Sequence, residues 1–294
     1  MEKSLPYVIV SPAKDEERNI ELTLESVVRQ TMKPALWVIV DDSSRDRTPE
    51  IIRQWSRRHS FIELVQNGSP GKRQPGARVV QAFNLGYRAA VETHHDFLVK
   101  LDCDLSFEAD YFEKLLGRFL ENKRLGIASG VYLELNGEGL WKEVRMPRYH
   151  AAGACKVIRR SCFVEIGGFV AAPGWDTVDE IRAMTRGWHT GHFRDLIMRH
   201  HKTEGSGIGV IKTSVMHGEI YYRTGGSKLF FLPKILRRMA TKPYLVVGLA
   251  LGWGYLKSAL RQKERLVTDA EARYYKALLR KRLMGSEWTS LRGN

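Results

Sequence analysis

The chain has 294 residues, of which 43% are hydrophobic and 27% charged, so it is a globular protein of one large α/β domain or a domain with an appendage. Its net charge of +14 points to a polyanionic partner, which could be nucleic acid, an anionic membrane or a phosphorylated substrate. Residues 1–222 carry a net charge of only +2, whereas residues 223–294 carry +12. The three cysteines, Cys103, Cys155 and Cys162, lack a metal-binding spacing, which favours reduced thiols over a disulfide framework.

Apolar, β-branched runs alternate with helical patterns through the first 125 residues. Strands are predicted at Tyr7–Ser11, Leu36–Val40, Phe61–Val65 and Phe97–Leu101. Helices are predicted at Ile20–Thr31, from Thr48 as N-cap, at Ala77–Val91, and from Ser106 as N-cap to Asn122. Segments 71–76 and 205–207 are predicted as glycine-containing loops. The alternation predicts a Rossmann-like α/β fold, with a mostly parallel sheet, flanking helices and ligands beyond the carboxyl ends of the strands.

Three acidic clusters follow predicted strands and are expected on that one edge of the sheet. They are Asp15-Glu16-Glu17, Asp41-Asp42 and Asp102-x-Asp104. Two carboxylates separated by one residue repel each other, and a divalent cation such as Mg²⁺ or Mn²⁺ would neutralise them. A solvated turn that caps the next helix is the alternative for Asp102 and Asp104.

Several motifs occur in a fixed order over about residues 6–205. They are Pro12–Glu17 (PAKDEE), Val40–Ser44 (VDDSS), Asn84 with Gly86, Asp102-x-Asp104, Arg159–Phe169 (RRSCFVEIGGF), and Trp175-Asp176 followed by Arg182 and Gly187-Trp188. In this order they resemble glycosyltransferase family 2, the inverting nucleotide-sugar transferases of the GT-A fold.

The resemblance implies a role for most of the acidic clusters. The expected nucleotide-sugar-binding residues are Pro12, Ala13, Lys14, Glu16, Val40, Asp42, Asp102 and Cys103. A carboxylate such as Asp42 can accept the imino hydrogen of uracil, which favours a UDP-sugar. The resemblance places Asp104, with His201, at a Mn²⁺ or Mg²⁺ ion that bridges the diphosphate, and Lys202 beside it.

Inversion requires a base opposite the leaving group, and the family pattern puts Asp176 at that position. The residue before it is Trp175, where the family usually has Glu, so Asp179 and Glu180 remain rivals at the start of a helix predicted over Asp179–Arg186. Trp175 either stacks on a sugar or acceptor ring or belongs to the core.

The C-terminal region, 223–294, alternates apolar blocks with Lys and Arg. Pro243–Leu256 is apolar but shorter than the roughly 20 residues of a membrane-spanning helix, and Thr268–Glu271 forms a capping box. This pattern predicts basic amphipathic helices on an anionic membrane surface, contributed by residues 226–294. Packing of Pro243–Leu256 on the catalytic domain is the alternative, and no nucleic acid is expected as a partner.

These observations predict a catalytic domain over residues 1–222, with a nucleotide-sugar-binding half (1–105) and an acceptor-binding half (106–222). We expect a metal-dependent inverting glycosyltransferase acting on a lipid-linked saccharide or another hydroxyl acceptor. A polyprenyl-phosphate acceptor is the alternative, and a non-catalytic binding module and a sugar-1-phosphate nucleotidyltransferase are weaker rivals. The N-terminus lacks a signal-peptide pattern, so peripheral attachment to the cytoplasmic face of the membrane is expected.

Overall fold

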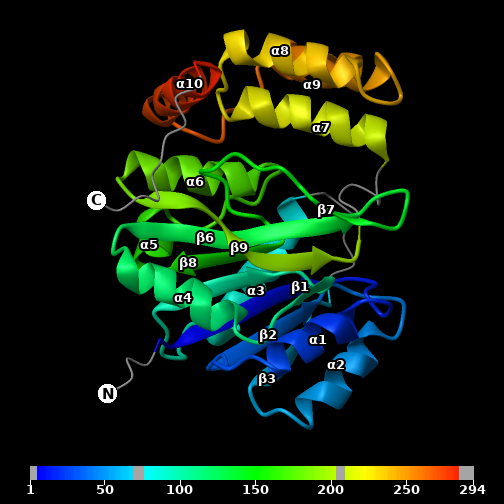
Figure 1. The fold of residues 1–294 in the computed structure, drawn as a ribbon, viewed down its shortest axis with the longest axis vertical. Coiled ribbons are helices and arrows are strands. Elements are labelled where there is room, and N and C mark those ends of the chain that lie inside the picture. The colour runs from blue at the N-terminus through cyan, green and yellow to red at the C-terminus, as the bar shows by residue number, and fades with distance from the viewer. Residues whose placement is uncertain (1–4, 69–75, 203–208, 285–294) are drawn as a thin grey trace.

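The structure is a computed structural model that describes residues 5–68, 76–202 and 209–284. A central sheet is covered by helices on both faces, and a separate layer of helices lies above one edge (Figure 1). The predicted loop at 205–207 and all but the last residue of the loop at 71–76 lie outside the described residues.

The first half of the chain forms the predicted parallel strands. They are β1 (Tyr7–Ala13), β2 (Leu36–Asp41), β3 (Ile62–Gln66) and β4 (Phe97–Leu101), in the spatial order β3-β2-β1-β4. The connecting helices are α1 (Ile20–Val28), α2 (Thr48–Ser56) and α3 (Ala77–Ala90). Side chains alternate across β1: Ile9 packs in one core with α1 and α2, and Val10 packs in another with α3. The sheet is therefore buried on both faces, as parallel sheets require.

The second half of the chain extends the same sheet with mixed directions. Its strands are β5 (Leu105–Phe107), β6 (Leu125–Leu135), β7 (Trp141–Glu143), β8 (Cys155–Arg159) and β9 (His189–His200). Its helices are α4 (Tyr111–Glu121), α5 (Arg160–Glu165) and α6 (Trp175–Thr185). β8 joins β4 and β6 in antiparallel pairing, and β9 runs parallel to β6. The predicted α/β fold with a mostly parallel first half and flanking helices is confirmed.

Three predicted helix starts are wrong. The helix predicted from Asp179 begins four residues earlier, at Trp175. The other two concern residues that were expected to be N-caps. Ser106 does not cap a helix but lies in β5, which pairs with the end of β9, and α4 begins only at Tyr111. Thr48 is the first residue of α2 rather than its N-cap, and the Asp46 side chain accepts the Thr48 N–H at 3.0 Å. In both places a side chain that can cap a helix serves a different hydrogen bond, which the sequence pattern does not distinguish.

The helical layer consists of α7 (Val210–Arg223), α8 (Lys228–Met239), α9 (Val246–Leu260) and α10 (Asp269–Leu283). It therefore begins ahead of the boundary predicted at residue 223. The capping box of Thr268 and Glu271 at the start of α10 is confirmed. α7 and α9 approach so closely that a Cβ at Gly218 or Gly254 would meet the backbone of the facing helix.

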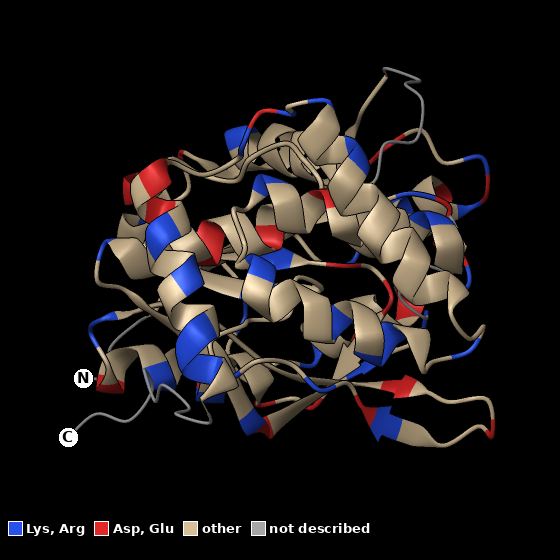
Figure 2. Ribbon diagram, turned by 90° about the horizontal axis from the view of Figure 1, so that it is seen from above, with Lys and Arg blue, Asp and Glu red and all other residues tan. Residues whose placement is uncertain are grey.

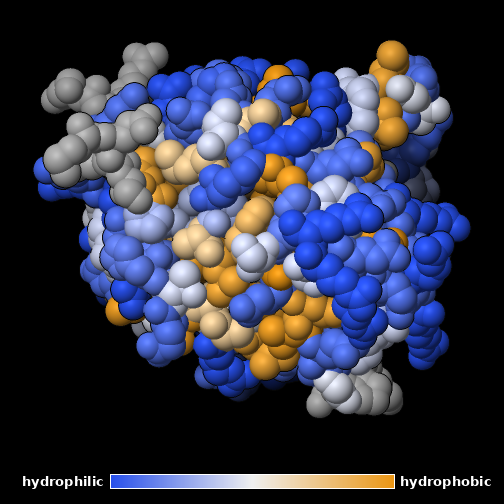
Figure 3. All heavy atoms as spheres, turned by 90° about the horizontal axis from the view of Figure 1, so that it is seen from below, coloured by the Kyte–Doolittle hydropathy of each residue, from blue (hydrophilic) through white to orange (hydrophobic). Residues whose placement is uncertain are grey.

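The helical layer packs on α6 through a shared apolar core that includes Val178, Ile181, Tyr221 and Leu251. In the described parts of the chain, no helix is both long and apolar enough to cross a membrane. On the opposite side of the molecule, hydrophilic side chains surround apolar ones that gather toward the middle of that face (Figure 3).

Candidate active site

The three predicted acidic clusters lie at one edge of the sheet, where β1, β2 and β4 end. The loop after β1 is tied to the loop after β2, because Asp42 N–H donates to the Ala13 carbonyl at 2.8 Å and Lys14 Nζ donates to the Asp42 carbonyl at 2.8 Å. Asp102 N–H donates to the Ala154 carbonyl at 2.7 Å, which fixes the residue that follows β4. The parallel topology thus collects side chains from positions up to 90 residues apart along the chain.

Asp42 is 9% exposed and is held by two donors. Arg78 on α3 donates through Nε and Nη2 to its two oxygens, and Asn67 Nδ2 donates to Oδ1 at 2.9 Å. Each carboxylate oxygen can accept two hydrogen bonds, so these three bonds leave one acceptor position on Oδ2. Val40 is fully buried beside it in β2. The carboxylate is therefore oriented rigidly and keeps the capacity to accept one further donor.

Glu16, Asp102 and Asp104 form a concentrated set of negative charge. Burial, together with Asp104 and Asp102, raises the pKa of Glu16 to about 7, against the opposing effect of Lys202. Glu16 Oε2 and Asp104 Oδ1 are buried without a hydrogen-bond partner among the described residues. Unpartnered buried carboxylate oxygens are costly, and a bound cation would offset that cost.

Two basic side chains partly neutralise this set. Lys100, a buried residue of β4, donates to Asp102 Oδ1 at 2.5 Å and to the Gly153 carbonyl at 2.7 Å. Lys202 donates to Glu16 Oε1 at 2.7 Å. The structure thus brings Lys202 into contact with the acidic edge through Glu16, and its predicted role at the diphosphate stays a prediction.

The structure brings His200, rather than the predicted His201, to the Asp104 side chain. His200 Nε2 lies 3.4 Å from Asp104 Oδ2, whereas the His201 ring bonds Ser106 Oγ at 2.8 Å and packs against Trp141. His200 is the last residue of β9, and His201 follows the strand, where its ring turns to Ser106 instead of Asp104. Burial alone would lower the pKa of His200, but Asp104, Asp102 and Glu134 raise it to about 9.

Few protein side chains are available as ligands at the predicted metal site. In the described ranges no group of three or more His, Cys, Asp or Glu side chains is arranged around a common point for a metal ion. Asp104 nevertheless offers a free buried oxygen, and Mg²⁺ and Mn²⁺ sites often take one or two carboxylates plus substrate phosphates. The residues present therefore fit a cation that arrives with its substrate.

Asp176 lies in the first turn of α6 and contacts the segment at Gly153. A Cβ at Gly153 would come 3.3 Å from Asp176 Oδ2, so the carboxylate lies directly against residue 153. The carbonyl of that same residue accepts a hydrogen bond from Lys100, which also holds Asp102. One ammonium group thus connects the Asp102 carboxylate to the segment that contacts Asp176.

The two rival acids are both committed to a buried ion-pair network. Lys156 is fully buried and donates to Asp179 Oδ2 at 2.8 Å, to Glu180 Oε1 at 3.3 Å and to the Asp176 carbonyl at 2.9 Å. Burial raises the pKa of Asp179 to about 7, against the opposing charge of Lys156. Glu180 also bonds His150 Nδ1 at 2.9 Å. Among these acids, Asp176 alone is partly exposed, and the network holds the first turn of α6 in place.

Two other predicted site residues are buried. Trp175 is 7% exposed and packs against Phe169 with 4.6 Å between ring centroids, which corresponds to the core alternative for this residue. The Cys103 side chain is 2% exposed, and its thiol points to the Pro12 carbonyl. Only the backbone of Cys103 can therefore contribute to a donor site.

Four side chains that contact the predicted site residues are not themselves among the predicted site residues. Lys100 and Lys156 interrupt otherwise apolar strands, which is a detectable signal because a buried lysine requires a partner. Only the pairing of β9 with β5 shows that the side chain of His200, and not that of His201, reaches Asp104. Arg78 carries no distinguishing pattern.

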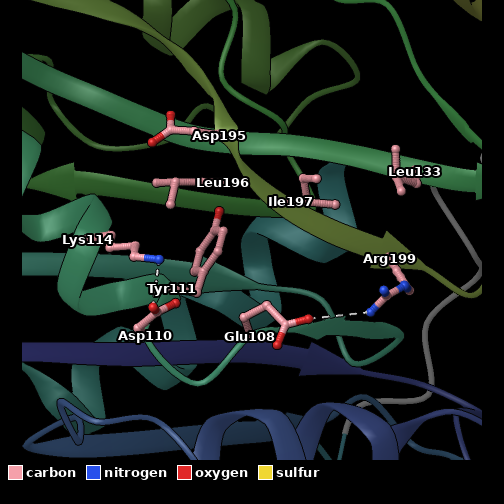
Figure 4. A pocket seen from close by; sticks show the side chains of 9 residues that line it. All are labelled: Glu108, Asp110, Tyr111, Lys114, Leu133, Asp195, Leu196, Ile197 and Arg199. Atoms are coloured by element: carbon pink, nitrogen blue, oxygen red, sulfur yellow. Dashed lines mark ion pairs between the residues drawn. The ribbon is translucent and has the colours of Figure 1, made fainter.

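A shallow pocket lies elsewhere, between the start of α4 and β9 (Figure 4). Four of its five charged side chains pair with one another, Lys114 with Asp110 at 2.6 Å and Arg199 with Glu108 at 3.8 Å. None of the predicted site residues lines it, so it does not compete with the acidic edge as the candidate active site.

Comparison with known proteins matches the part of the chain that carries most of these residues. The family model described as "Glycosyl transferase family 2" matches residues 8–172. "Probable glycosyltransferase YdaM" of Bacillus subtilis (strain 168) is 27% identical over 216 residues, which cover 65% of this chain and 50% of that protein. "Glycosyltransferase AglE" of Haloferax volcanii is 34% identical over 83 residues, 26% of this chain and 27% of that protein. The chain thus spans half or less of the length of these curated relatives.

Solved structures superpose on nearly the whole chain. The mannosyltransferase PcManGT from Pyrobaculum calidifontis, in complex with GDP-Man and Mn²⁺, superposes with a TM-score of 0.56 at 18% identity, covering 99% of this chain and 83% of that one. S. aureus TarS 1–349 in complex with UDP-GlcNAc gives a TM-score of 0.56 at 14% identity, covering 98% and 83%. At these identities the likeness concerns the fold.

Proposed function

The chain belongs to glycosyltransferase family 2, the nucleotide-sugar transferases of the GT-A fold, and on that basis we propose that it moves a sugar from a UDP-sugar, with inversion, to a hydroxyl of a lipid-linked acceptor at a membrane surface. The observation that carries this proposal is the position of Asp176 against Gly153, whose carbonyl is held by the same lysine that holds Asp102. This link between Asp102 and the segment that contacts Asp176 supports the assignment of the two carboxylates to one active site.

The residues proposed to bind the nucleotide-sugar donor recognise its nucleoside through separate contacts to the base and the ribose. Asp42, fixed by Arg78 and Asn67, accepts the uracil imino hydrogen on its remaining Oδ2 position. Asp102 holds the ribose side, and the segment of Pro12, Ala13 and Lys14 closes the nucleoside pocket. UDP is favoured because uracil carries a donor at the position where cytosine carries an acceptor.

The acceptor side is proposed to depend on Asp176. In an inverting displacement the acceptor oxygen attacks the anomeric carbon as the bond to the nucleotide diphosphate breaks, and Asp176 takes the hydroxyl proton. The helix start of α6 stabilises the carboxylate before the proton arrives. Asp104 would hold a Mn²⁺ or Mg²⁺ ion, which supplies positive charge for the departing diphosphate.

The donor assignment is tested by a thermal-shift screen of nucleotide diphosphates and nucleotide sugars with Mn²⁺. We expect UDP and UDP-sugars to raise the unfolding temperature more than GDP, CDP or their sugars, because ligand binding to the folded state stabilises it by mass action. Asp42→Asn replaces the acceptor with an amide and should remove this preference. A larger shift with GDP than with UDP would contradict the proposed base selection.

Attachment to a membrane is supported by the outer face of the helical layer. On α8, Leu229, Leu232 and Leu236 are 58–69% exposed, and on α9 Leu249, Trp253, Leu256 and Leu260 are 49–72% exposed. The residues on each helix share one face, since they are spaced three or four apart. Lys and Arg are spread over this layer and Asp and Glu are few (Figure 2). An exposed apolar face within a basic surface suits an anionic lipid leaflet.

Flotation with phosphatidylglycerol vesicles tests the attachment. We expect the triple variant Leu249→Ser, Trp253→Ser, Leu256→Ser to bind vesicles at least about tenfold more weakly than the wild type, because each buried apolar side chain contributes about 1.5–3 kcal/mol. The matched control, Leu120→Ser with Leu135→Ser and Leu140→Ser, alters three leucines that are 43–62% exposed outside the helical layer. Equal flotation of the two triple variants would refute the attachment surface.

A further inference from the structure

The helical layer carries a second charged feature close to where it packs on α6. α7 meets the start of α6 at Ile220, whose side chain leaves no room for a Cβ at Gly174, two residues before Asp176. His217 lies one turn before Ile220 and therefore on the same face of α7. The fold thus places His217 next to the turn that carries the proposed base.

Basic side chains of α8 and α10 gather around this face. Lys234 Nζ lies 5.3 Å from the centroid of the Tyr221 ring, which is one turn after His217 on α7. Arg238 follows Lys234 by one turn on α8. Arg282 of α10 lies 5.5 Å from the ring of Phe230, one turn before Lys234. Three cations from two helices therefore line one side of α8, and we call Lys234, Arg238 and Arg282 the cation cluster.

The cation cluster is not neutralised by the parts of the chain that the structure describes. No carboxylate in those parts forms an ion pair with any of its three members, although ion pairs hold most other cations near the active site. Like charges one turn apart on a helix repel, and a half-buried ammonium loses hydration. Lys234 is half-buried, whereas Arg238 and Arg282 are exposed, so an anion can reach the cluster from solvent.

The titration behaviour of neighbouring groups agrees with this geometry. Burial, together with the charges of Arg238 and Arg282, lowers the pKa of Lys234 to about 8. Burial, Lys234 and Arg238 lower the pKa of His217 to about 4, and Asp176 opposes them. The His217 imidazole therefore interacts electrostatically with both the cation cluster and the proposed base, Asp176.

We propose that the cation cluster binds a phosphate group of the acceptor lipid and so presents the acceptor hydroxyl to Asp176. This inference rests on the proposed function and adds the chemical class of the acceptor, a saccharide joined to an apolar chain through phosphate. The rings of Tyr221 and Phe230 beside the cations suit the first carbons of that chain. The phosphodiester that joins the saccharide to the chain carries one negative charge, which charge-assisted hydrogen bonds from the cation cluster can bind.

Binding of farnesyl phosphate and of uncharged farnesol to the full chain, below their aggregation concentrations, isolates the contribution of the phosphate. We expect the wild type to prefer farnesyl phosphate by at least about tenfold, since hydrogen bonds to charged groups are the strong ones. Lys234→Met with Arg238→Met should abolish this preference, and Arg282→Met alone should reduce it. Arg53→Met with Arg57→Met removes two charges at the same spacing on α2, far from the layer (Figure 1), and should keep the preference.

Two further measurements separate the alternatives. Binding of UDP with Mn²⁺ should be unchanged in the Lys234→Met, Arg238→Met variant. If that variant lost flotation with phosphatidylglycerol vesicles but kept its preference for farnesyl phosphate, the cluster would serve membrane headgroups and the proposal would be wrong. If wild-type protein bound no nucleotide diphosphate but the preference still depended on the cluster, the phosphate site would stand and the proposed transferase function would fall.

Discussion

Replacing Asp176 with Asn is expected to lower turnover of the nucleotide sugar by a factor of about 10²–10⁴, the usual contribution of a positioned general base. The amide keeps the shape of the side chain against Gly153 but cannot take a proton. Binding of the nucleotide diphosphate should be unchanged, because Asp176 is placed on the acceptor side. The measurement is hydrolysis of the UDP-sugar that gives the largest thermal shift, without acceptor, followed by transfer to lipid extracts.

The control is Asp269→Asn, which removes a carboxylate from the first turn of another helix, where its side chain is 85% exposed. It should leave turnover as it is in the wild type. A loss of less than about threefold in Asp176→Asn would refute the base assignment. A lipid phosphate, already ionised, could then be the attacking group, because it needs no base.

Asp104→Asn is expected to abolish the part of nucleotide-diphosphate binding that depends on Mn²⁺. Asp104 provides an unpartnered buried oxygen, and an amide oxygen at the same place lacks the negative charge that attracts a divalent cation. Calorimetric titration of UDP in the presence of Mn²⁺ should show a loss of affinity of at least about tenfold, while titration with EDTA present should give similar weak binding for both proteins.

Asp110→Asn serves as the control, because Asp110 is an exposed carboxylate near the same β5–α4 segment and pairs with Lys114 rather than with the acidic edge. It should bind UDP and Mn²⁺ as the wild type does. Undiminished Mn²⁺-dependent affinity in Asp104→Asn would overturn the metal role of this residue and leave Glu16 as the nearest remaining candidate.

The sequence was sufficient for the features that depend on local pattern and chain order. The strand positions of β1, β2 and β4 follow from apolar, β-branched runs, and the carboxylates after them share an edge because parallel strands point the same way. The capping box at Thr268 is purely local and was predicted correctly. Family motifs then named the fold and the enzyme class.

The remainder depended on tertiary contacts that no local pattern encodes. β5 forms only because the end of β9 returns to pair with it, so Ser106 was taken for a helix cap. The same pairing sets the strand phase that directs His200, and not His201, to Asp104. α7 reads as an ordinary amphipathic helix, and its membership in the helical layer follows from its contact with the glycines of α9.

The glycine contacts between α7 and α9 also affect the distance between the proposed membrane surface and Asp176. Backbone meets backbone at Gly218 and Gly254, and the Ile220 side chain of α7 packs directly on Gly174 at the start of α6, so the three helices are closely packed at these points. With α9 lying on a bilayer as proposed, the separation between the lipid surface and Asp176 becomes a fixed length. The enzyme would then select acceptors whose hydroxyl lies at one fixed distance from the membrane surface.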